Sequence, residues 1–184
     1  MEHNRPYQVT RSETHQIGRL TVVKDTILIG GKEHPYTYVA YGDSVCVLPI
    51  YQGKVIAIEQ YRHTLNSWEL ELPCGGIERG ETPENAARRE LAEETGCIAG
   101  ELVYLGKYYT NQGYSNAACS VYFTRCIGRG PTQTEETELI RLCEIPVPDF
   151  QEMAEDGRFR LLIGLAAWYQ AKRHGLLNAQ GGES

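Results

Sequence analysis

The sequence predicts an α+β fold in which helices sandwich a mixed sheet. Three observations lead to this prediction: strand-like segments fill the first third of the chain, a helix with clear boundaries follows, and two more helices close the chain. Strands, a helix, strands and then helices, joined by short connections, are typical of such a sandwich. A doubly wound Rossmann fold is not expected, because no G-x-G-x-x-G sequence stands between a strand and a helix.

The first third of the chain is rich in β-branched and aromatic residues that are punctuated by glycine. This pattern predicts a meander of strands at 18–29, 35–42, 44–51 and 54–62. The sequence also predicts a short strand at 68–73. Its alternation places Trp68, Leu70 and Leu72 on one face and Glu69 and Glu71 on the other.

The helix in the middle of the chain has strong local boundary signals. Thr82 can cap it, Pro83 suits its first turn, where no amide hydrogen is needed, and Gly96 can terminate it. We therefore expect a helix at 83–95. After it, the sequence predicts strands at 101–109 and 118–127, an acidic loop at 132–140, and helices at 150–156 and 160–173.

The composition narrows the classes of protein to which the chain can belong. With 184 residues, 41% of them hydrophobic, it can bury one sizeable core. It has no apolar run of the roughly 18 residues that span a membrane, and its first residues lack the apolar stretch of a signal peptide, so a cytoplasmic location is expected. A net charge of −6 leaves no broad basic surface. We expect neither a membrane nor a nucleic-acid partner.

Three carboxylates crowd one side of the middle helix. Glu90, Glu93 and Glu94 fall within an arc of about 100°, although like charges one turn apart destabilise a helix. Mg²⁺ or Mn²⁺ would offset this repulsion, because these hard cations bind oxygen ligands. Zinc fits poorly, since the six cysteines are scattered without a C-x-x-C pair. A solvated acidic face remains the alternative interpretation of the spacing.

Arg89 stands four residues before Glu93, which is close enough for an ion pair that would hold Glu93 in place. The glycines at 75, 76 and 80 allow a tight loop whose carbonyls approach the same helix. A loop and a helix would thus converge on one site.

These residues match the signature sequence of Nudix hydrolases, which the segment 75–97 closely resembles. The matching positions are Gly75, Glu81, Arg89, Glu90, Leu91, Glu93, Glu94 and Gly96. Cys97 departs from the signature, which has an aliphatic residue there, but cysteine is also small and apolar.

The resemblance extends to the ADP-ribose pyrophosphatase branch of that family and covers roughly 18–173. It implies a Nudix-type α/β/α sandwich at 42–175 and an N-terminal antiparallel strand extension at 1–41 that forms a homodimer. A disordered tail is expected at 176–184.

The resemblance also assigns roles to individual residues. It implies that divalent ions are bound by Glu90, Glu94 and the Cys74 carbonyl, and that the acidic loop supplies Glu136 as base and Glu138 as metal ligand. Arg62 is placed against the substrate's phosphates. Apart from the resemblance, Trp68, Tyr36 and Tyr38 have rings that can stack on a base, although aromatic residues at strand spacing are more often core. The expected site comprises catalytic Glu136, Glu93 and Arg89, substrate-binding Arg62, Gly75, Gly76 and Trp68, and metal-binding Cys74, Glu90, Glu94 and Glu138.

The expected activity is Mg²⁺-dependent hydrolysis of the pyrophosphate bond of a nucleoside diphosphate sugar, ADP-ribose first, giving AMP and ribose 5-phosphate. Two alternatives remain: a pyrophosphatase for GDP-mannose or another nucleotide sugar, and a non-catalytic module that binds ADP-ribose and regulates. The branch usually carries a Ser-Pro-Gly-like stretch where this chain has Asn111, Gln112 and Gly113. Glutamine in place of proline frees φ and adds a hydrogen-bonding group beside the expected sugar pocket.

Overall fold

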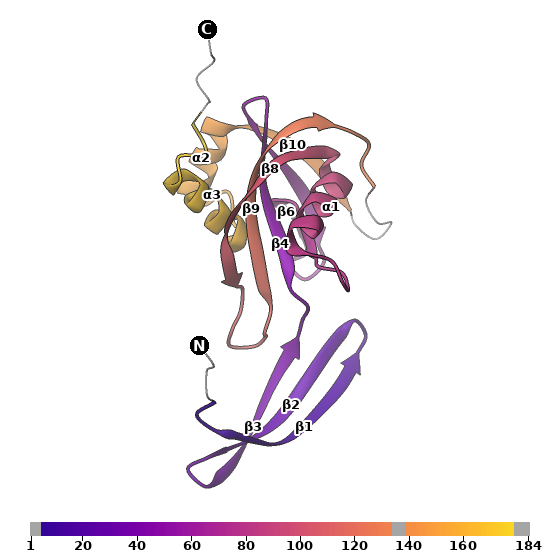
Figure 1. The fold of residues 1–184 in the computed structure, drawn as a ribbon, viewed down its shortest axis with the longest axis vertical. Coiled ribbons are helices and arrows are strands. Elements are labelled where there is room, and N and C mark those ends of the chain that lie inside the picture. The colour runs from indigo at the N-terminus through magenta and orange to yellow at the C-terminus, as the bar shows by residue number, and fades with distance from the viewer. Residues whose placement is uncertain (1–4, 134–138, 179–184) are drawn as a thin grey trace. The chain divides into compact units, whose positions relative to one another are not determined.

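The computed structural model describes residues 5–133 and 139–178. These residues form two compact units, which are drawn together in Figure 1. Segment 109–118 belongs to the first unit with the residues up to Gly42, and the second unit takes the remaining described residues from Asp43 onward. Within the described chain, no helix is long and apolar enough to cross a membrane.

The first unit is an antiparallel sheet of three strands in the order β1-β2-β3, which confirms the predicted strand extension. The strands are β1 (Gln8–Ile17), β2 (Leu20–Ile29) and β3 (Lys32–Ala40). Strand β1 was not predicted. Segment 109–118 is tied to the end of β3, since the Val39 amide donates to the Tyr114 carbonyl at 2.8 Å.

The second unit contains a mixed sheet with the strand order β10-β5-β4-β9-β8, in which β6 also pairs with β5 and β7 with β4. Strands β4 and β9 run parallel, whereas β5 is antiparallel to β4, β6 and β10. The strands are β4 (Ser44–Tyr51), β5 (Lys54–Arg62), β6 (Ser67–Glu71), β7 (Cys74–Gly76), β8 (Cys97–Tyr109), β9 (Ala118–Arg129) and β10 (Ile140–Pro146).

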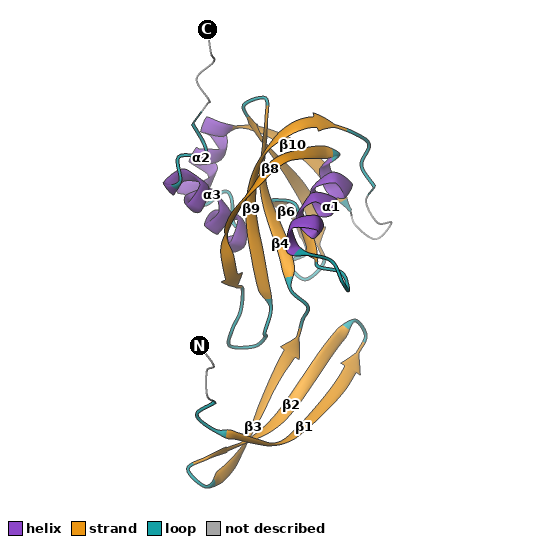
Figure 2. Ribbon diagram, in the orientation of Figure 1, coloured by secondary structure: helices purple, strands orange, loops and turns teal. Residues whose placement is uncertain are grey.

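Helix α1 (Pro83–Thr95) covers one face of this sheet, and α2 (Val147–Asp156) and α3 (Leu162–Arg173) cover the other (Figure 2). Strand β4 is buried on both faces. Its residues Cys46 and Leu48 belong to the core cluster beneath α2 and α3, while Val45 and Val47 pack in the cluster beneath α1. This alternation, which follows from the two-residue period of a strand, confirms the predicted α/β/α sandwich.

Helix α1 has the predicted bounds, but the last two helices begin elsewhere than the sequence predicts. Helix α2 begins at Val147, three residues before the predicted start, because Pro148 fits a first helical turn as well as it fits a loop. Helix α3 begins at Leu162 rather than 160. The rings of Phe150 and Trp168, 4.9 Å apart, join the two helices in the core.

Candidate active site

The site begins at the loop that joins β7 to α1. Thr82 caps the helix, since its hydroxyl accepts from the Asn85 amide at 3.2 Å. Gly96 ends the helix in the left-handed conformation, with φ of 70°. Strand β7 pairs with β4, with Gly75 opposite Val45, so the loop is anchored to the centre of the sheet. The local signals in the sequence therefore fix where the acidic face of α1 meets this loop.

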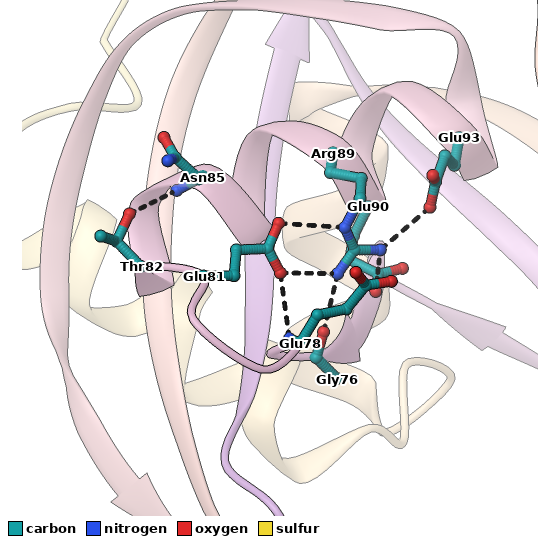
Figure 3. Close-up of polar contacts among 8 residues, drawn as sticks. All are labelled: Gly76, Glu78, Glu81, Thr82, Asn85, Arg89, Glu90 and Glu93. Atoms are coloured by element: carbon teal, nitrogen blue, oxygen red, sulfur yellow. Dashed lines mark hydrogen bonds and ion pairs between the residues drawn. The ribbon is translucent and has the colours of Figure 1, made fainter.

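Arg89 lies at the centre of the network shown in Figure 3. Its Nε and Nη2 donate to the two oxygens of Glu81 at 3.1 and 3.0 Å, and Nη2 also donates to the Gly76 carbonyl at 2.8 Å. Its Nη1 donates to Glu90 at 2.7 Å and to Glu93 at 3.0 Å. These five hydrogen bonds match the five N–H donors of a guanidinium group.

This network offsets part of the repulsion between the carboxylates of α1. Arg89 pairs with Glu93, as the sequence predicts, and in addition with Glu90 and Glu81. The carboxylate of Glu81, and after it that of Glu90, raises the pKa of Arg89, while Arg89 in turn lowers the pKa of Glu81. Arg89 therefore holds the loop and the acidic face of the helix together.

Gly75 makes room for the carboxylate of Glu90. A Cβ atom at position 75 would lie 2.0 Å from Cδ of Glu90 and 2.1 and 2.2 Å from its two oxygens. No real Cβ atom approaches another atom so closely, so only glycine allows this approach at Gly75. The close contact brings the backbone of β7 directly against a candidate ligand.

Glu94 reaches the same loop from the next position on the helix face. Only 4% of Glu94 is exposed, and its Oε2 accepts a hydrogen bond from the Cys74 amide at 3.1 Å. The thiol of Cys74 is hydrogen-bonded to that of Cys46 and is partly buried, and the hydrogen bond and the desolvation both raise its pKa well above the ordinary value. This shift favours the protonated thiol, so the backbone oxygen of Cys74 is the better candidate ligand for a hard cation.

A cavity of about 300 Å³ collects these groups. Its lining includes three residues that sequence reasoning missed, Ile77, Glu78 and Gln133. Gln133 precedes β10. Its backbone N–H donates to the Glu93 carbonyl at 2.8 Å, which ties Gln133 to the end of α1. The full lining comprises Gly75, Gly76, Ile77, Glu78, Arg89, Glu90, Glu93, Glu94 and Gln133.

The chemistry of this cavity suits a divalent cation that prefers oxygen ligands. In residues 5–133 and 139–178, no three His, Cys, Asp or Glu side chains converge tightly enough to hold an ion by themselves. Mg²⁺ does not need such a cage, because it keeps several waters and is commonly held by one or two carboxylates and substrate phosphates. The carboxylates of Glu90 and Glu94 beside the exposed backbone of the loop fit that requirement.

The remaining predicted residues lie outside this cavity or outside the described chain. Arg62 is paired with Glu71. The ring of Trp68 is covered by the guanidinium of Arg141, 3.7 Å from the ring centroid, and Trp68 lines a different cavity. The predicted base and loop ligand, Glu136 and Glu138, are not among the described residues.

A comparison with known families agrees with the fold and with the arrangement at α1. The NUDIX domain model matches residues 40–163, which is more than half of the chain. The chain therefore belongs to the Nudix hydrolase family, whose members generally use divalent cations.

Among individual relatives, the chain is similar to the ADP-ribose pyrophosphatase of Bacillus subtilis (strain 168), with 31% identity over 72% of this chain and 74% of the relative. It is also similar to the methanol dehydrogenase activator of Bacillus methanolicus, with 28% identity over 79% and 83% of the two chains. A crystal structure of an ADP compounds hydrolase shares the fold, with a TM-score of 0.81 and 23% identity over 91% and 93% of the chains.

Cys97, the one departure from the signature, is fully buried in the cluster beneath α1. Its thiol is hydrogen-bonded to that of Cys126, which lowers the pKa of Cys97 and raises that of Cys126.

Cys97→Val is expected to lower the free energy of unfolding by less than about 1.5 kcal/mol, because the side chains have similar volumes. Urea unfolding measures this loss. Leu91→Ala, in the same cluster, should cost about 2–5 kcal/mol, and an equal loss for Cys97→Val would contradict the expectation.

Proposed function

We propose that the chain is a Mg²⁺-dependent pyrophosphatase that hydrolyses ADP-ribose to AMP and ribose 5-phosphate. The observation that carries this proposal is the convergence of Glu90, Glu93 and Glu94 on the Gly75–Gly76 backbone in one cavity, with Arg89 joining them. The name of the Bacillus subtilis relative supports the choice of ADP-ribose.

The residues would divide the chemistry as follows. Glu90, Glu94, the Cys74 carbonyl and Glu138 would hold Mg²⁺, or Mn²⁺ in its place, which when bound neutralises the pyrophosphate and activates water. Arg62 would bind the phosphates. Glu136 would accept the proton of the attacking water.

A GDP-linked sugar such as GDP-mannose is the second candidate substrate, because Asn111, Gln112 and Gly113 replace the stretch expected for ADP-ribose. Gln112 lines a cavity of about 240 Å³ in the first unit, together with Tyr36 and Tyr38. A hydrogen-bonding side chain beside aromatic rings can change the preference for a nucleotide sugar without abolishing hydrolysis. A non-catalytic module that binds ADP-ribose is a weaker candidate, because every carboxylate of the signature is present.

The test is kcat/KM on ADP-ribose, GDP-mannose, UDP-glucose, NADH and diadenosine polyphosphates, each with Mg²⁺ and with excess EDTA. ADP-ribose should rank first, and EDTA should abolish turnover. If ADP-ribose ranked tenfold or more below another substrate, the first choice would be wrong. Full activity in EDTA would contradict the metal dependence, and binding of ADP-ribose without turnover of any compound would favour the regulatory module.

We also propose that the protein is a cytoplasmic homodimer assembled through the first unit. Its strands carry exposed apolar side chains, with Ile17 61% and Ile29 49% exposed, and a three-stranded sheet can hide little of such surface alone. Light scattering at micromolar concentration should give twice the mass of one chain. The double variant Ile17→Lys with Ile29→Lys should shift this mass toward the monomer, and a monomeric wild type would refute the proposal.

A further inference from the structure

Glu71 is a buried carboxylate that belongs to no part of the Nudix signature. It ends β6, and only 5% of it is exposed. The Arg62 guanidinium meets it edge-on, with Nε 2.6 Å from Oε1 and Nη2 2.5 Å from Oε2. Such a bidentate pair fixes the plane of the guanidinium group as well as its position. Glu71 is therefore placed to determine how Arg62 is oriented.

The pair leaves part of the guanidinium free to bind a second anion. Glu71 occupies the edge formed by Nε and Nη2, and Nη1 of Arg62 donates to no acceptor in the described part of the chain. The Arg62 side chain is 42% exposed, whereas that of Glu71 is 7% exposed. A phosphate can thus approach the Nη1 side while Glu71 holds the other edge.

The position of the pair connects it with the cavity beside α1. Only Leu72 and Pro73 separate Glu71 from Cys74, and the Cys74 backbone N–H donates a hydrogen bond to Glu94. The hydrogen-bonded carboxylate of Glu71 raises the pKa of Arg62 most, and the negative charge of Glu94 raises it further. The guanidinium therefore lies within electrostatic reach of a carboxylate that lines the cavity.

We propose that Glu71 is a positioning residue, which orients Arg62 so that its Nη1 side faces the phosphates of the substrate. This role rests on the proposed function, because Arg62 acts on phosphates only if the chain binds a nucleoside diphosphate. Since the pair as a whole is neutral, Glu71 contributes orientation rather than additional attraction. The benefit is that Arg62 loses its rotational freedom before the substrate binds.

The first test is the kinetics of Glu71→Gln, which keeps the size of the side chain and loses the charge and the bidentate contact. Arg62 would bind the phosphates equally well in the ground state and in the transition state. When Arg62 loses its fixed orientation in this variant, KM should therefore rise about tenfold and kcat should change less than about twofold. The matched control is Glu69→Gln, since Glu69 lies in the same strand and is paired with the exposed Arg160 at 2.7 Å. This control should leave KM unchanged.

The second test separates orientation from stability. The double variant Arg62→Glu with Glu71→Arg restores an ion pair, so it should recover most of the melting temperature lost by either single change and should keep the high KM. Arg62→Lys retains the positive charge but lacks the two parallel N–H donors of the bidentate contact, so it should also raise KM. It replaces Glu71→Gln as the test if that variant does not fold. Recovery of both stability and KM in the double variant would show that the pair is merely structural and would overturn the proposal.

Binding measured by calorimetry without added metal distinguishes failure of this role from failure of the proposed function. If the wild type turns over no substrate in the panel, the hydrolase proposal fails. The role of Glu71 still predicts that Glu71→Gln weakens ADP-ribose binding about tenfold relative to the wild type and to Glu69→Gln. An unchanged Kd, or no binding by the wild type, would overturn the role.

Discussion

A Glu94→Gln variant is expected to lose about a hundred- to a thousandfold in kcat and to keep its fold. The amide oxygen of glutamine can still accept the hydrogen bond from Cys74, so the contact between α1 and the loop survives. The negative charge that helps to hold a cation is lost, and the loss of one electrostatic contribution of this kind to a transition state has a cost of that order. Steady-state kinetics with saturating Mg²⁺ and a thermal melt measure the two effects separately.

The matched control for this variant is Glu84→Gln on the same helix. The Glu84 side chain is 57% exposed and is paired with Arg88 at 3.1 Å, away from the cavity. Surface changes of this kind rarely alter stability by more than about 0.5 kcal/mol, so activity and melting temperature should stay near wild type. Wild-type turnover by Glu94→Gln, or an equal loss in Glu84→Gln, would exclude the assignment of Glu94.

Gly75→Ala is expected to lower kcat about a hundredfold or more, because the new Cβ would lie 2.0 Å from Cδ of Glu90. The pairing of Gly75 with Val45 in the centre of the sheet limits how far the backbone can retreat. Glu90 must therefore move, and overpacking of this kind costs about 1–3 kcal/mol of stability. Kinetics and urea unfolding measure the two losses.

Two further variants make this prediction specific. Gly128→Ala adds the same methyl group on β9, where the nearest atom, Cδ1 of Ile98, is 3.4 Å away, and it should be active. Adding Glu90→Asp to Gly75→Ala shortens the displaced side chain, which should recover stability without recovering kcat. Normal activity of Gly75→Ala would mean that the close approach of Glu90 to the loop is unimportant for catalysis.

The sequence predicted best those features that are determined by local interactions. The bounds of α1 follow from the cap at Thr82, the proline at Pro83 and the glycine at Gly96, all within one helix length. The spacing of the signature then places its carboxylates on one face, because the period of a helix is fixed. The fold class, and the meeting of these carboxylates with the loop in one cavity, could be predicted for this reason.

The features that the sequence did not reveal depend on contacts between distant segments. Strand β1 is mostly exposed and polar, so it lacks the apolar alternation that marks a strand, and only its pairing with β2 makes it one. Glu71 alternates with leucines and has the pattern of a solvent-facing residue, yet Arg62 holds it in the interior. Gln133 lines the cavity only because the segment before β10 is hydrogen-bonded to the end of α1.

The burial of β4 on both faces also determines how the second unit unfolds. Alternate side chains of this strand belong to different core clusters, so water cannot enter one cluster by removing β4 without opening the other. Parts of a protein that share such an element unfold as one cooperative unit. The amide hydrogens of β4 should therefore exchange with solvent only when the whole unit opens, whereas those of β1, at the edge of its sheet, should exchange through local fraying.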